Sequence, residues 1–71
     1  MSQIIQVDPD VMGGAPVFKG TRVPVQTLFD YLEGGEPLEE FLEDFPTVSK
    51  SQAIQLLEEL KNQAINSTKV A

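Results

Sequence analysis

The segment of the sequence best equipped for chemistry is residues 13–25, GGAPVFKGTRVPV, which holds three of the five glycines and the only arginine. Glycines beside a basic side chain are typical of phosphate-binding loops, but such a loop has the order G-x-x-x-x-G-K-[ST] between a strand and a helix. Here Lys19 precedes Gly20, and Thr21 and Arg22 lead into β-prone residues. The order of residues therefore argues against a nucleotide site.

Arg22 has two interpretations. A lone arginine is commonly solvated, or paired with an acid of its own chain. Displayed on a glycine-enabled bend, its planar guanidinium could instead donate to a carboxylate or phosphate of a partner. The glycines themselves are interpreted as structural, because glycine adopts positive φ angles without steric cost.

Carboxylates are concentrated between positions 30 and 44, where seven of the eleven acids lie. Glu39 with Glu43 and Glu40 with Asp44 are four residues apart, a spacing that places them on a helix surface. Catalytic or metal-binding carboxylates converge in a cleft with further ligands. The chain has no histidine and no cysteine, so we interpret these acids as a solvated face. We predict no catalytic residue, no metal and no cofactor, and hence no enzyme.

The length of 71 residues predicts one small domain. No disulfide or common zinc cluster can stabilise it, which leaves well-packed helices or oligomerisation. The net charge of −6 argues against nonspecific binding to nucleic acid. No apolar run reaches the length of a membrane span and no signal peptide is evident, so we expect a cytoplasmic protein without a membrane partner.

The predicted fold is mainly α, with a short N-terminal β-hairpin followed by a three-helix bundle that has a helix-turn-helix-like arrangement. Residues 4–7 are β-prone, and DPDVM could form one helical turn that a glycine stops. The pieces PVF and RVP flank a glycine reversal and predict the hairpin. Two apolar stripes at helical spacing then predict helices that start near Pro24 and Pro37: Val25, Leu28, Phe29 and Leu32, and Leu38, Phe41, Leu42 and Phe45.

A third helix of about 14 residues is predicted to begin after Ser49, which with Gln52 forms a capping-box pattern. Its expected buried residues are Ala53, Ile54, Leu57, Leu60 and Ala64. The division of the chain is therefore a single domain over residues 1–62 and a flexible C-terminal tail over residues 63–71. The second and third helices, joined by PTVS, have the layout of a helix-turn-helix. In that unit the first turns of the second helix meet base edges, so the candidate DNA-binding residues are Lys50, Ser51, Gln52 and Gln55.

The glycine-rich segment also resembles a known family. A Gly-x-Pro-x-x-x-Gly-Thr-Arg-[Ile/Val]-Pro-Val segment after Asp-Pro and before three helices resembles the signature of the small prokaryotic family called domain of unknown function 433. The resemblance covers about residues 4–60. The residues of the structural signature are Gly14, Pro16, Gly20, Thr21 and Pro24.

The resemblance implies a compact antitoxin of a type II toxin–antitoxin pair, similar to the VapB type. Its partner would be a PIN-like ribonuclease, neutralised by direct binding at the metal-dependent nuclease site, and the complex would regulate its own operon. Homodimers or higher homo-oligomers are also implied. Pro37 stands where the family often has Ser, and the tail is short.

The predicted toxin-binding residues are Arg22 and, second to it, Lys19, and the alternative source of the basic contact is Lys61 together with Lys69. A basic side chain on a rigid bend would compete with metal or RNA phosphate at a carboxylate-rich site. The alternative function is a stand-alone helix-turn-helix DNA-binding transcriptional regulator that binds operator DNA. A third alternative is an assembly or adaptor domain.

Overall fold

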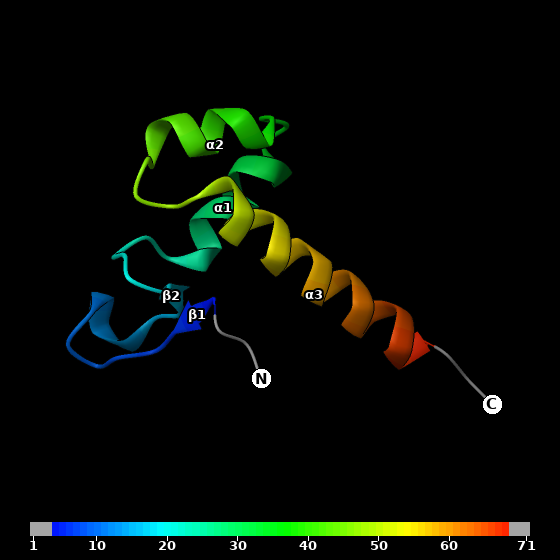
Figure 1. Cartoon of the computed structure of the whole chain (residues 1–71), viewed down its shortest axis with the longest axis horizontal. Helices are drawn as coiled ribbons and strands as arrows, with labels where there is room; N and C mark the ends of the chain where they lie inside the picture. The colour runs from blue at the N-terminus through cyan, green and yellow to red at the C-terminus, as the bar shows by residue number, and fades with distance from the viewer. Residues whose placement is uncertain (1–3, 69–71) are drawn as a thin grey trace.

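The computed structural model describes residues 4–68 (Figure 1). The order of elements is β1 (Ile5–Gln6), a 3-10 turn η1 (Met12–Gly14), β2 (Val17–Phe18), α1 (Val25–Glu33), α2 (Leu38–Asp44) and α3 (Lys50–Thr68). The predicted fold class, a mainly α chain with a short N-terminal hairpin followed by three helices, is confirmed. None of the described helices is both long and apolar enough to span a membrane.

The N-terminal sheet pairs β1 with β2 in antiparallel register, with Ile5 opposite Phe18. The sequence predicted a hairpin within residues 16–24 alone. The chain does reverse there, but beyond β2 only one bridge forms, between Val17 and Pro24. Two hydrogen bonds flank this bridge, from the Phe18 N–H to the Val23 carbonyl and from the Val25 N–H to the Pro16 carbonyl. The ladder ends there because α1 begins at Val25. The main partner of β2 is therefore β1, which the sequence did not assign to it.

The segment between the strands is a pair of tight turns and not the expected turn of α-helix. The Asp8 carboxylate accepts a hydrogen bond from the backbone N–H of Asp10 at 2.9 Å, the geometry of a turn that an aspartate side chain closes. Met12, Gly13 and Gly14 then all adopt positive φ angles, of 51°, 66° and 89°. The glycines form part of this reversal and do not merely end a helix.

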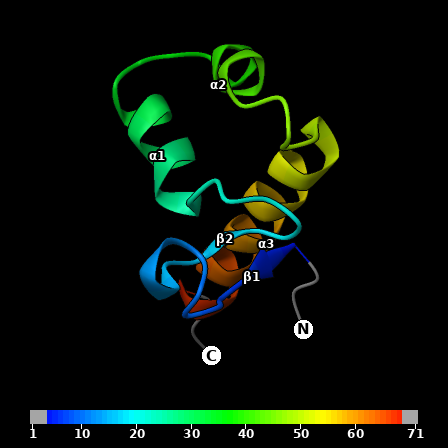
Figure 2. The same cartoon turned by 90° about the vertical axis from the view of Figure 1, so that its left-hand side faces the viewer.

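The first two helices agree closely with their predicted stripes. Gly34 ends α1, and Pro37 lies at the N-cap of α2, one position before the first helical residue. In the perpendicular view of Figure 2, α1 and α2 arch above the sheet. Between these elements and the start of α3 is the core, which contains Ile4, Phe18, Val23, Leu28, Phe41, Val48, Ala53 and Leu56.

Helix α3 differs most from the prediction. It continues to Thr68 instead of ending near residue 64, so residues 63–68 of the expected tail are helical, and residues 69–71 lie outside the described part. The predicted burial of Ile54, Leu60 and Ala64 is wrong, because all three are exposed, whereas the unpredicted Leu56 is buried. Figure 1 shows the reason: only the first half of α3 reaches the body of the domain.

Candidate functional site

The bend Lys19–Arg22 is held by the side chain of Thr21. Its hydroxyl donates to the carbonyl of Phe18 at 2.8 Å and accepts from the backbone N–H of Val23 at 3.0 Å. The N–H of Phe18 donates to the carbonyl of Val23 at 3.0 Å and closes the loop. Gly20 has φ of 80°, a conformation that side chains disfavour. The Gly-Thr pair therefore shapes the bend, as the sequence predicted for its glycine.

Two glutamines attach this bend to the rest of the domain. The Gln6 side-chain oxygen accepts from the N–H of Gly20 at 3.2 Å. The Gln52 side-chain nitrogen donates to the carbonyl of Lys19 at 3.0 Å. Their roles depend on residues 14 and 33 positions away, and no local pattern in the sequence indicates them. The bend is thus supported by both β1 and α3.

The two basic side chains of the bend point into solvent. Lys19 and Arg22 are both exposed, although each is next to one buried residue, Phe18 and Val23 respectively. Over residues 4–68 the structure contains one salt bridge, between Lys61 and Glu58. Arg22 therefore forms no ion pair with an acid of the described residues. Its exposure agrees with the solvated side chain of the plainer interpretation and leaves the guanidinium accessible to a partner.

The remaining predicted binding residues lie elsewhere along α3. Lys50, Ser51 and Gln55 are exposed on its first turns. Gln52, by contrast, is engaged in the fold: its oxygen accepts from the N–H of Ser49 and its own N–H donates to the Ser49 hydroxyl, both at 3.0 Å. The predicted capping box is confirmed. Because Gln52 forms part of it, one of the four candidate DNA-binding residues is already engaged within the fold.

Lys61 lies on the distal half of α3, away from the bend. Its ammonium is 3.2 Å from a carboxylate oxygen of Glu58, one turn earlier on the same helix. The structure therefore brings Lys19, Arg22 and Gln52 into one region. It does not bring Lys61 to them.

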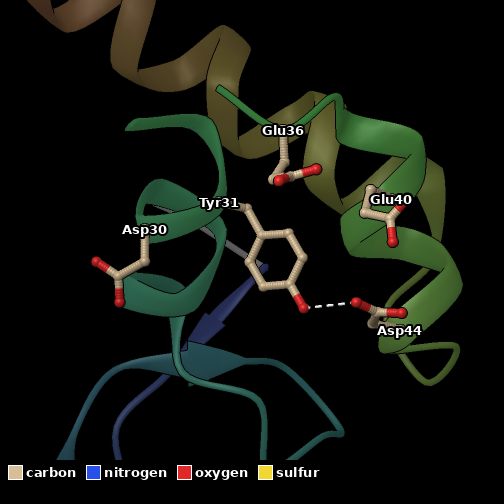
Figure 3. Close-up of a pocket in the computed structure, with 5 residues that line it drawn as sticks. All are labelled: Asp30, Tyr31, Glu36, Glu40 and Asp44. Atoms are coloured by element: carbon tan, nitrogen blue, oxygen red, sulfur yellow. Dashed lines mark hydrogen bonds between the residues drawn. The ribbon is translucent and has the colours of Figure 1, made fainter. Parts of the chain in front are cut away.

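A second region is an acidic cleft of about 420 Å³ between α1 and α2 (Figure 3). The Tyr31 hydroxyl donates to Asp44 Oδ2 at 2.6 Å across this cleft. That hydrogen bond, with desolvation and the nearby carboxylates of Asp44, Glu40 and Glu36, raises the pKa of Tyr31 to about 12. No group of three potential metal ligands occurs among residues 4–68.

The cleft modifies the interpretation of the acids as a solvated face. Glu40 and Asp44 are exposed, as expected, but they also line a shared concavity with Tyr31. The sequence could not reveal this arrangement because Tyr31 and Asp44 lie 13 residues apart on different helices. Acids thus line this cleft, whereas the bend displays two exposed basic side chains, Lys19 and Arg22.

Comparison with known proteins gives a consistent family match. The family described as "Protein of unknown function (DUF433)" matches residues 5–58. A DUF433 member protein from Anabaena variabilis has a crystal structure with a TM-score of 0.63 and 33% sequence identity, over 90% of this chain and 66% of that one. The uncharacterized protein y4eO of Sinorhizobium fredii is 39% identical over 46 residues. That match covers 65% of this chain but only 21% of y4eO, so the chain spans about a fifth of its length.

Proposed function

From its place in the DUF433 family, to which this chain belongs, we propose that the protein is the antitoxin of a toxin–antitoxin pair. It neutralises a PIN-like ribonuclease by direct binding in the cytoplasm. The observation that supports this proposal is the exposed guanidinium of Arg22 on a bend fixed by hydrogen bonds from Thr21, Gln6 and Gln52.

The proposed interface joins the basic bend of this chain to the active site of the nuclease. A PIN-like nuclease site is rich in carboxylates that surround a divalent metal ion. Arg22 would present a planar pair of donors to those carboxylates, which favours bidentate binding. Because the bend is already ordered, little conformational entropy is lost when it docks. Lys19 is the secondary contact, and Lys61 is the alternative source of a basic contact.

The test is a titration of the purified chain against the PIN-like protein encoded beside it, followed by calorimetry and by residual ribonuclease activity. Arg22→Glu should raise the Kd roughly 30-fold or more, as for removal of one partner of a buried, hydrogen-bonded charge pair. Lys50→Glu is the matched control, since it makes the same change in charge at another exposed site. Unchanged affinity of a folded Arg22→Glu variant would remove Arg22 from the mechanism.

The alternative function, a DNA-binding regulator, is favoured by one observation: Lys50, Ser51 and Gln55 are exposed on the first turns of α3. Against it stand the net charge of −6 and the engagement of Gln52 with Ser49 and Lys19. A gel shift on the chain's own promoter, titrated with salt, separates the two. A specific complex without toxin that weakens steeply with salt would favour regulation.

A further inference from the structure

One face of α3 carries four exposed residues in a regular series, which we call the outer stripe: Ile54, Glu58, Lys61 and Ile65. At about 100° per residue, positions i, i+4, i+7 and i+11 lie within roughly 60° of one another around a helix. Ile54 is 44% exposed and Ile65 is 55% exposed. Two large apolar side chains thus lie in solvent with a charged pair between them.

The outer stripe faces away from the domain. The α3 residues that contact the body include Ala53 and Leu56, which are buried, Leu57, which is partly buried against the core, and Gln52, which donates to Lys19. By the same helical rotation Gln52 and Leu56 lie on the opposite side of α3 from the stripe, and Ala53 lies on its flank. Figure 1 shows that the second half of α3 extends beyond the other elements. The distal part of the stripe is therefore accessible to another helix.

The sequence of the stripe reads Ile-x-x-x-Glu-x-x-Lys-x-x-x-Ile, which is self-complementary when reversed. Ile54 and Ile65 are equally distant from the same midpoint as Glu58 and Lys61. We propose that the stripe binds the stripe of a second copy of this chain, with the two α3 helices antiparallel. Isoleucine then opposes isoleucine at both ends, and each Glu58 opposes the Lys61 of the other copy.

The charged residues of the stripe already form an ion pair within one copy. Glu58 and Lys61 form an ion pair at 3.2 Å within one helix, and their side chains are 56% and 59% exposed. In the dimer the same charges also meet across the two-fold axis, as flanking charges do between paired helices. Leu60 and Ala64, which are exposed, lie beside the stripe on one flank of the helix and extend the apolar surface.

The distribution of charge favours this face for self-association. Seven acids lie between positions 30 and 44, so two copies that met through α1 and α2 would repel each other. From Glu58 to Thr68 the charged residues are two acids and one lysine. Like-charge repulsion between copies is therefore weaker along the distal part of α3.

The size of the interface predicts a weak dimer. Ile54 and Ile65 are eleven residues apart, which is roughly 16 Å along a helix. An overlap of about three turns is below the standard interface of roughly 800 Å² per partner. We therefore expect a Kd on the order of tens of micromolar.

Sedimentation equilibrium of the whole chain, without toxin, at concentrations up to several hundred micromolar tests the pairing. The wild type should dimerise, whereas Glu58→Lys and Lys61→Glu should each be monomeric, because two like charges then meet twice across the axis. An equimolar mixture of the two variants should associate again, because in the mixed dimer both lysines of one copy oppose both glutamates of the other. Circular dichroism checks that both variants stay helical.

A second pair of variants tests the apolar contacts. Ile65→Asp should raise the dimer Kd at least tenfold, whereas Gln63→Asp, an exposed change on the other side of the same turn, should leave it within threefold. A wild type that stays monomeric, single charge variants that dimerise normally, or a mixture that stays monomeric would each overturn the proposal. This inference goes beyond the antitoxin function and does not depend on it, because the assay contains no partner protein.

Discussion

Gln52 Nε2 lies 3.0 Å from the carbonyl oxygen of Lys19, and this hydrogen bond joins the first turn of α3 to the bend that carries Arg22. The same side chain accepts from the N–H of Ser49 through its oxygen. One amide therefore caps a helix and braces a loop 33 residues away. The geometry of the candidate binding bend depends on α3 as well as on its own turn residues.

Replacement of Gln52 should separate these two roles. Gln52→Ala removes the capping box and the brace, and we expect unfolding free energy to fall by about 1–2 kcal/mol. Gln52→Glu keeps an acceptor for the Ser49 N–H but cannot donate to the Lys19 carbonyl. Its unfolding free energy should therefore fall by less than that of Gln52→Ala. Urea unfolding measures both. Amide exchange in residues 19–22 should accelerate in both variants, and an unchanged exchange rate would contradict the brace.

Thr21→Val should damage the bend while it preserves the shape of the side chain. The hydroxyl bonds to the Phe18 carbonyl and the Val23 N–H are lost, and a partly buried N–H is left without its acceptor. We expect a loss of about 1–3 kcal/mol in unfolding free energy. Thr21→Ser, which keeps the hydroxyl, is the matched control. Equal stability of the valine and serine variants would show that the hydroxyl does not hold the bend.

Tyr31 is the only tyrosine of the chain, so its ionisation can be followed by ultraviolet absorbance. We expect the pKa of Tyr31 to be about 12, against the ordinary 10.0. Asp44→Ala removes the hydrogen bond that is the largest cause of the raised pKa, so the pKa of Tyr31 should fall. Glu40 and Glu36 remain, so it should stay above the ordinary value. Asp30→Ala, which alters the cleft but not the hydrogen bond, should change the pKa less.

The same pKa shift predicts the direction of pH dependence. Between pH 10 and pH 12 the folded chain keeps the phenol proton that the unfolded chain has lost. The contact with Asp44 therefore stabilises the fold fully below pH 10, and its contribution falls as pH rises toward 12. Thermal unfolding of the wild type and of Tyr31→Phe should converge over that range. A difference in melting temperature between the two proteins that stays constant with pH would contradict a stabilising contact between Tyr31 and Asp44.

Two leucines of α3 provide a test of where the helix meets the domain. Leu56 is 1% exposed and Leu60 is 37% exposed. Leu56→Ala should cost about 2–5 kcal/mol of unfolding free energy through lost burial and a cavity. Leu60→Ala should cost less than about 1 kcal/mol at concentrations where the chain is monomeric. Chemical denaturation at low protein concentration compares the two, and similar losses would contradict the separation of α3 into packed and projecting halves.

Local patterns in the sequence determined much of this protein. The stripes of α1 and α2, the Ser49–Gln52 capping box, the glycine stop after Glu33 and the reversal at Gly20 all follow from interactions within a few residues. Helical periodicity and backbone preference are local properties, so they can be recognised from the amino-acid sequence alone. The Gly-Thr-Arg signature is equally local, and it indicated the family from the order of residues alone.

Other features were decided only by tertiary structure. The periodicity of α3 shows that one side is apolar, but it cannot show how far that side stays in contact with the domain. The burial of Leu56 and the exposure of Ile54 therefore appeared only in three dimensions. The pairing of β2 with β1, the brace from Gln52 to Lys19 and the contact of Tyr31 with Asp44 also join residues far apart in sequence. Such contacts depend on how the packed elements are placed relative to one another, a relation that no local pattern encodes.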